Sequence, residues 1–320
     1  MIETALLEMV EPETAGDPMT KRKWVRRSLR TLAAHLVREG HAASAPTVAR
    51  LLRKHDYSLR VNAKEKESGA QHPERNRQFE YIEEQSARFR AALSPIISVD
   101  TKKKELIGDF RQAGQNWVKE PMEVNVHDFP SEAVGRAVPY GVYDVTRNEG
   151  AVFVGRSADT PAFAVSAIAR WWEMIGAGAY PQARELLILA DSGGSNGCRS
   201  GVWKEQLQQQ LCERLGLTVT VSHYPRGCSK WNPVEHRLFS QISVNWAGQP
   251  LRSYKLMLGY LRGTRTATGL KVRAQMLEGV FETGRRVAKA VLKQLPIERH
   301  DVCPQWNYTI RPHAQPAEGG

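Results

Sequence analysis

The spacing of apolar residues changes near Pro95 and divides the chain into a helical first part and an α/β second part. Before this point apolar residues recur at helical intervals, and after it they form short runs typical of buried strands. Strands are predicted at 96–100, 141–145, 151–155, 185–190 and 217–221, and helices at 162–175, 202–215 and 233–244. The order β-β-β-α-β-α-β-α predicts an α/β layer with a mixed sheet.

Two helices are predicted within residues 24–60. Thr20 can cap the first, whose apolar stripe is Trp24, Leu29, Leu32, Ala33, Leu36 and Val37. After Gly40, the sequence Ser44-Ala-Pro46 starts a second helix that is basic on one side. Two helices joined by a short glycine-containing turn predict a helix-turn-helix, although a plain helical hairpin with a charged face has the same pattern.

These patterns give the expected fold class: a ribonuclease H-like mixed sheet flanked by helices, preceded by a small all-α helix-turn-helix domain. Because the chain opens in what resembles the end of an amphipathic helix, we expect its first residues to be the remnant of a longer N-terminus. The expected parts are a leading segment 1–20, a helix-turn-helix domain 21–62, a connector helix within 63–94, a ribonuclease H-like domain 95–250, and a C-terminal helical extension and tail 251–320 with a helix at about 272–295.

Positive charge is concentrated in one segment. Residues 21–66 contain 13 Lys or Arg and 3 Asp or Glu, a net +10 out of +11 for the chain. This favours a polyanionic partner, double-stranded DNA ahead of a membrane, over a solvated basic face. No stretch approaches a membrane span and the start is not a signal peptide, so a cytoplasmic, nucleoid-associated protein is expected. The candidate DNA contacts are Lys21, Arg22, Lys23, Arg26, Arg27, Arg30, Arg50, Arg53 and Lys54, with Lys230 and Trp231 near the last predicted helix.

Two aspartates end apolar runs. Asp100 closes Ile-Ile-Ser-Val-Asp, and Asp191 closes Leu-Leu-Ile-Leu-Ala-Asp before Ser-Gly-Gly. A carboxylate at the end of a buried strand is costly unless it is paired or bound to metal. Each has a simpler interpretation as a turn or cap residue. Together, at strand ends where α/β sheets gather their ligands, they favour a metal site.

Glu235 is a third candidate ligand. Asn232-Pro233 starts a helix, and Leu238, Phe239 and Ile242 follow Glu235 at helical spacing, so Glu235 lies on the apolar face. A favourable helix dipole explains an acid in a first turn but not one on the buried side. Three carboxylates on rigid elements suit Mg²⁺ or Mn²⁺, with two ions expected, in phosphoryl transfer.

Other metal-site interpretations stay open. Asp144, in a strand beside the first, is the reserve carboxylate. A zinc site could draw on the cysteines and histidines Cys198, Cys228, His223 and His236, but their spacing fits no common zinc module. The four cysteines are more simply small core residues.

Seven phrases carry a resemblance to a known family. They are Ser98-Val-Asp-Thr-Lys-Lys-Lys-Glu105, Val124-Asn-Val-His-Asp-Phe-Pro130, Tyr140-Gly-Val-Tyr-Asp144, Arg147-Asn-Glu-Gly150, Ala190-Asp-Ser-Gly-Gly-Ser-Asn196, Ser229-Lys-Trp-Asn-Pro-Val-Glu-His-Arg-Leu-Phe239 and Gln305-Trp-Asn-Tyr308. The chain resembles bacterial insertion-sequence transposases of the DDE class, ISAzo-type family, from about residue 10 to 312.

The resemblance implies a catalytic and metal-binding triad of Asp100, Asp191 and Glu235. It implies metal-dependent hydrolysis at the transposon's terminal inverted repeats and transfer of the freed 3′ hydroxyl to target DNA, by a homo-oligomer on DNA. Two alternatives are a ribonuclease H-like nuclease and a non-catalytic DNA-binding repressor derived from a transposase. The presence of all three acids argues against the repressor.

Overall fold

A computed structural model describes residues 2–10, 14–16, 23–25, 28–55, 57, 72–116 and 118–313. The chain forms two compact units, Met1–Lys66 and Glu67–Gly320. Within the described ranges, no helix is long and apolar enough to cross a membrane.

The first unit holds three helices around a small apolar core. They are α1 (Ile2–Val10), α2 (Leu29–Arg38) and α3 (Ala45–Lys54). The hydroxyl of Ser28 caps α2 and that of Ser44 caps α3, each accepting from a backbone N–H three residues on. Leu6, Leu36 and Val48 are fully buried between the helices.

Two expectations for this unit were wrong. The first helix begins after Ser28, and Trp24 lies in a strand. Strands β1 (Thr14–Gly16) and β2 (Lys23–Val25) pair antiparallel, so the unit is not purely helical. Ser28, which directly follows the basic pair Arg26-Arg27 in the sequence, caps this helix, and the expected cap, Thr20, lies outside the described residues.

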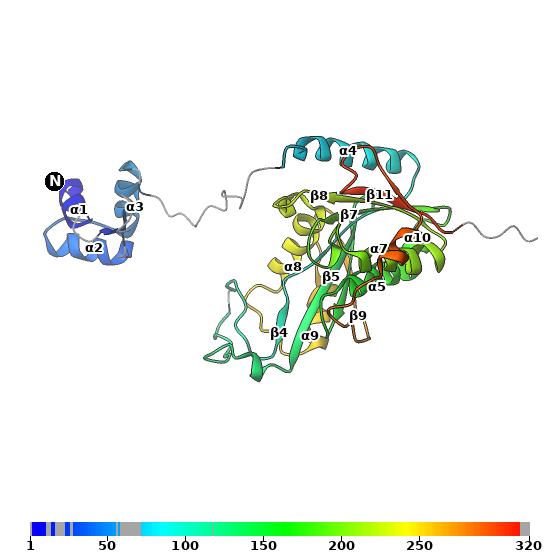
Figure 1. Ribbon diagram of the computed structural model, residues 1–320. Helices are drawn as coiled ribbons and strands as arrows, with labels where there is room; N and C mark the ends of the chain where they lie inside the picture. Colours follow the sequence, from blue (N-terminus) through cyan, green and yellow to red (C-terminus); the bar gives the residue numbers. More distant parts are fainter. Residues whose placement is uncertain are drawn as a thin grey trace, which may run out of the picture. The chain divides into compact units, whose positions relative to one another are not determined.

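The second unit is built on one mixed sheet, as the strand pattern predicted (Figure 1). Its strands are β3 (Ile96–Thr101), β4 (Glu105–Ile107), β5 (Gly135–Asp144), β6 (Glu149–Gly155), β7 (Glu185–Asp191), β8 (Thr218–Tyr224), β9 (Lys271–Met276), β10 (Ile297–Arg299) and β11 (Asn307–Ile310). The order is β10-β11-β8-β7-β3-β5-β6-β9, and β4 pairs with β5. Strands β3, β7 and β8 are parallel, while β5 runs antiparallel to β3 and β6 to β5. This is the ribonuclease H-like arrangement.

Helices cover both faces of the sheet. One face carries α5 (Pro161–Trp171), which continues through π-helix η2 (Trp172–Gly176) into α6 (Ala177–Ala179), and α7 (Gly201–Leu207), which continues as π-helix η4 (Gln208–Glu213). The other carries π-helix η6 (Val234–Phe239), its continuation α8 (Ser240–Asn245), α9 (Tyr254–Gly263) and α4 (Arg75–Ala91). Helix α10 (Lys289–Gln294) and 3₁₀ turns η1 (Pro130–Glu132), η3 (Gly194–Asn196) and η5 (Ser229–Trp231) complete the unit.

The C-terminal stretch is only in part the helical extension that we expected, because α9 lies within it but the helix expected further on does not form. Strands β9, β10 and β11 all join the main sheet. The predicted helix over 272–295 is instead β9, a loop and the short α10. The alternation of exposed Lys271 and Arg273 with buried Val272 and Ala274 is a strand period, and it aligns these residues in parallel with β6.

Gly141 allows the glutamate-bearing helix to lie against the sheet. A Cβ on Gly141 would be 2.4 Å from Phe239 Cε1 and 3.2 Å from a methyl group of Val234. Gly141 is the register partner of Asp100 on the neighbouring strand. We therefore expect Gly141→Ala to destabilise the protein by roughly 1–3 kcal/mol through overpacking beside the site.

Thermal or urea unfolding would measure this effect. Gly178→Ala is the matched control, because a Cβ there meets nothing within 4 Å. The control should unfold at the same temperature or urea concentration as the wild type, or at a slightly higher one. Equal behaviour of the two variants would contradict the close approach of the helix.

Candidate active site

Asp100 and Asp191 lie at the carboxyl ends of adjacent parallel strands. In the register of β3 with β7, Val99 pairs with Ala190, so the two aspartates occupy the next positions along. Side chains alternate between the faces of a strand. Both aspartates therefore point to the face that carries η6, away from the core formed with α5 and α7.

Glu235 approaches the same point from η6. Its side chain is half-buried, and its pKa is raised by burial although Lys102, His236 and a hydrogen bond with Asp100 act to lower it. The sequence predicted an ordinary α-helix here, but the first six residues form a π-helix. The structure thus brings together the three acids that the sequence singled out.

Asn232 connects β3, β7 and the start of η6 through hydrogen bonds. Its side-chain amide donates to Asp191 Oδ1 at 3.2 Å and to the Val99 carbonyl at 3.3 Å, and its Oδ1 accepts from Ser98 Oγ. Ser98 Oγ in turn accepts from the backbone N–H of Val234 at 2.8 Å. The start of η6 is therefore hydrogen-bonded to both aspartate strands.

The electrostatics of the cluster are unfavourable in the protein alone. Burial, and then the nearby Asp191 charge, raise the pKa of Asp100 to about 8. Burial also raises the pKa of Asp191 to about 6, against the lowering effect of its Asn232 hydrogen bond. Crowded carboxylates with raised pKa values are the donor chemistry that a hard divalent cation neutralises.

Across the described parts of the chain, no three His, Cys, Asp or Glu side chains are grouped tightly enough to enclose an ion. This holds for the acidic triad and for the alternative zinc cluster. All four cysteines are free and buried.

Asp144, the reserve ligand, belongs elsewhere. It pairs with Ile97, three residues before Asp100, and is almost completely buried. Its carboxylate accepts from the backbone N–H groups of Thr146 and Arg147 and from the hydroxyl of Tyr180. Asp144 therefore has a structural role, because its carboxylate accepts the hydrogen bonds that stabilise the turn between β5 and β6.

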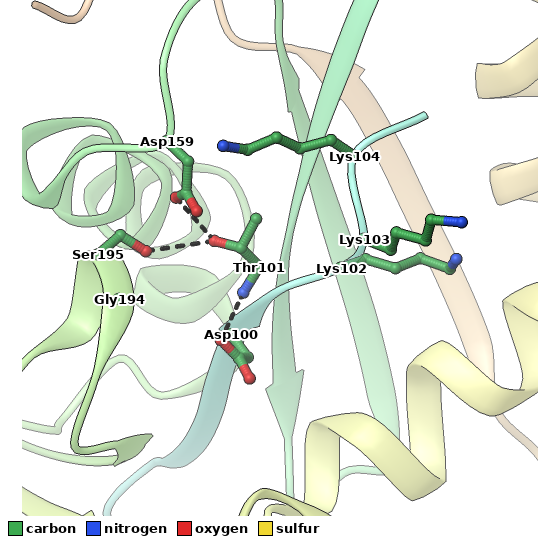
Figure 2. Close-up of a pocket in the computed structure, with 8 residues that line it drawn as sticks. All are labelled: Asp100, Thr101, Lys102, Lys103, Lys104, Asp159, Gly194 and Ser195. Atoms are coloured by element: carbon green, nitrogen blue, oxygen red, sulfur yellow. Dashed lines mark hydrogen bonds between the residues drawn. The ribbon is translucent and has the colours of Figure 1, made fainter. Parts of the chain in front are cut away.

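A cavity of about 470 Å³ opens beside Asp100 (Figure 2). Thr101 stands between two acids: its N–H donates to Asp100 Oδ1 at 2.7 Å, and its hydroxyl donates to Asp159 Oδ1 at 2.9 Å. Exposed Lys103 and Lys104 line the same cavity. The cavity offers both carboxylate and cationic groups to a phosphate-bearing ligand.

The lysine next to Asp100 is held by its own partners. Lys102 forms an ion pair with Glu105 at 3.2 Å, and both side chains are about 10% exposed. Its Nζ also lies 4.7 Å from the centre of the Trp246 ring. Lys102 also lines the cavity, but its ammonium group is already paired with Glu105.

Comparison with known protein sequences identifies the family of the chain. A sequence profile of the family described as Rhodopirellula transposase DDE domain matches residues 5–312. The chain belongs to this transposase family. No curated protein matches the chain.

Solved structures of Mos1 transposase resemble the chain at low identity. The paired-end complex with the left transposon end is 14% identical, with a TM-score of 0.44, and the match covers 81% of this chain and 69% of that one. The paired-end complex with Mg is 13% identical, with a TM-score of 0.44 and coverage of 81% and 68%. The complex with Mn is 13% identical, with a TM-score of 0.42 and coverage of 81% and 69%.

Several polar residues around the triad escaped the sequence analysis of this transposase. Ser98 was visible as the polar residue in an apolar strand, two positions before Asp100. Asn232 was noted only as a helix start. Asn196, which accepts from Tyr140 at 2.7 Å and donates to Asp100 Oδ1 at 3.4 Å, had no local signal at all.

The candidate DNA contacts fall into three groups. Arg30, Arg50, Arg53 and Lys54 are exposed on α2 and α3, where Lys54 pairs with Glu3 at 2.8 Å. Lys230 and Trp231 are exposed just before Asn232. The side chain of Lys23 in β2 is not described, and the remaining candidates, Lys21, Arg22, Arg26 and Arg27, lie outside the described residues.

Proposed function

We propose that the protein cuts DNA at the ends of its transposon and joins the freed 3′ hydroxyl to target DNA. One observation carries the proposal: Asp100, Asp191 and Glu235 come from three different elements and meet at one sheet edge. Family membership supports it, because the matched family is defined by a transposase DDE domain.

In this proposal the three carboxylates hold Mg²⁺ or Mn²⁺. Bound as a pair, the ions supply stabilisation of the attacking and leaving oxygens at the scissile phosphate. Asn232 orients the Asp191 carboxylate and fixes the start of the Glu235 helix. Lys103 and Lys104 contact the phosphates that flank the scissile bond.

We assign end recognition to the first unit. Helix α3 follows α2 after a short turn through Gly40 and presents exposed Arg50 and Arg53, as a recognition helix would. Lys230 and the half-exposed ring of Trp231 adjoin the catalytic glutamate and contact DNA near the cut. Two ends cut together require more than one active site, so a homo-oligomer forms on DNA.

The decisive experiment is cleavage and strand transfer on DNA carrying the element's ends, with Mg²⁺ or Mn²⁺. Metal-dependent nicking and joining by the wild type, lost in Asp191→Asn, is the expected result. Cleavage without joining would favour a ribonuclease H-like nuclease. DNA binding without cleavage by either protein would favour a repressor, and cleavage that survives in Asp191→Asn would overturn the triad.

A further inference from the structure

A buried series of three hydrogen-bonded side chains ends at the backbone carbonyl of Asp191. His223, in β8, is fully buried, and its Nδ1 lies 2.9 Å from the backbone oxygen of Asp191. Its Nε2 lies 3.1 Å from the hydroxyl of Tyr308, in β11. The indole Nε1 of Trp203, in α7, donates to the same hydroxyl at 2.9 Å.

The direction of every hydrogen bond in this chain follows from its ends. An indole N–H can only donate, and a backbone carbonyl can only accept. The Asp191 carbonyl can only accept, so His223 Nδ1 carries a proton and donates to it. Burial keeps the imidazole neutral, so Nε2 carries no proton and accepts from the hydroxyl of Tyr308, which in turn accepts from Trp203.

That carbonyl sits where β7 ends. Asp191 and Tyr224 are the last paired residues of the β7–β8 ladder, and the Ser192-Gly193-Gly194 turn follows directly. A partly buried carbonyl at the end of the ladder is stabilised by a hydrogen-bond donor. The bond from His223 fixes the peptide plane that follows Asp191, and thereby the direction of its side chain.

Asp191 is therefore held from both faces of the sheet. Alternation along β8 places His223 with Val221, on the α5 and α7 face. Asn232 holds the carboxylate on the opposite face. The backbone and the side chain of Asp191 are thus fixed by independent partners.

The C-terminal strand is firmly placed for this role. Gln78 of α4 donates to the His223 carbonyl at 2.9 Å and exchanges hydrogen bonds with the Asn307 side chain at 2.9 and 2.6 Å. Strand β11 pairs with β8 across Tyr308 and Val221. The hydroxyl of Tyr308 consequently has one fixed position.

We propose that Trp203, Tyr308 and His223 are positioning residues for the active site, and that strand β11 is a working part of it. The proposal rests on the proposed role of Asp191 as a metal ligand. It assigns a function to the Gln305-Trp-Asn-Tyr308 phrase, which lies far from the triad in sequence.

The test compares two variants of β11 that each lose one buried hydroxyl. Tyr308→Phe breaks the chain to Asp191, whereas Thr309→Val breaks bonds to Thr220 at 3.0 Å and to His300 at 2.8 Å. Mn²⁺ binding to the DNA-free protein is measured by calorimetry, with thermal unfolding in parallel. Loss of a hydrogen-bonded partner behind a ligand weakens metal binding by about 10-fold or more. We expect that loss in Tyr308→Phe and an unchanged affinity in Thr309→Val.

Equal Mn²⁺ affinity in Tyr308→Phe and wild type, or equal weakening in both variants, would overturn the proposal. The histidine ¹⁵N spectrum of the wild type gives a test that needs no variant. His223, identified by its contacts with Tyr308, should show the Nδ1–H tautomer. The Nε2–H tautomer would refute the hydrogen-bond series from Trp203 to Asp191. Asp191→Asn separates the two proposals: unchanged Mn²⁺ affinity there would refute the metal role of Asp191, while the tautomer still decides the hydrogen-bond chain.

Discussion

Asp100→Asn is expected to reduce cleavage of transposon-end DNA by more than about 100-fold, because removing a metal ligand should exceed the 10- to 100-fold effect of removing a ligand's partner. Asparagine keeps the shape of the side chain and can still accept from the N–H of Thr101. DNA binding should be unchanged, since the basic residues of the first unit are untouched. Single-turnover cleavage and a gel-shift titration would measure the two effects separately.

The same variant is expected to be more stable than the wild type without divalent cations. Burial and Asp191 raise the pKa of Asp100 from 3.8 to about 8 in the folded protein. The folded state therefore keeps a proton that the unfolded chain releases, and metal-free wild type loses stability as pH rises from about 4 to about 8. Each pH unit in this window lowers the free energy of unfolding by about 1.4 kcal/mol at most.

Thermal unfolding between pH 4 and pH 8 in a chelator measures this. Asp100→Asn should weaken the pH dependence of the unfolding temperature, and it should unfold at a higher temperature than the wild type at pH 7. Added Mn²⁺ should stabilise the wild type and reverse the order. A variant that cleaves normally would remove Asp100 from the triad, and one with unaltered metal-free stability would show that the carboxylates are not crowded.

The sequence was sufficient for the parts of the site that depend on single elements. Apolar runs that end in aspartate mark strands buried on both faces, and period-2 alternation then fixes the face on which Asp100 and Asp191 lie. The helical placement of Glu235 on an apolar stripe followed in the same way. These inferences worked because each depends on residues close together in the chain.

Tertiary partners were beyond the reach of such patterns. Asn232 and Ser98 are 134 positions apart, and Tyr308 is 85 positions from His223. Their roles arise from strand pairing that no local period encodes. The C-terminal strands show the same limit: the helix predicted over 272–295 begins in β9, whose six residues alternate over too short a stretch to identify a strand without the pairing with β6.

Asn232→Ala is expected to cost about 2–3 kcal/mol of stability and about 10- to 100-fold in cleavage. The side chain is fully buried, and its loss removes a donor to the Val99 carbonyl and the acceptor of the Ser98 hydroxyl proton. It also removes the only hydrogen bond to the carboxylate of Asp191 among the described residues. Urea unfolding and single-turnover cleavage, each with and without Mn²⁺, would measure both effects.

Asn245→Ala is the matched control, because its amide donates to the Tyr260 carbonyl from an exposed position in the same helical segment. It should change stability by less than about 0.5 kcal/mol and leave cleavage intact. Asn232→Asp sharpens the comparison, since it keeps an acceptor for Ser98 but places a carboxylate where the donor to Asp191 was. If the donor is what matters, Asn232→Asp should cleave no better than Asn232→Ala. A variant at Asn232 that loses stability but cleaves normally would show that Asn232 acts in folding alone, and that Asp191 is oriented without it.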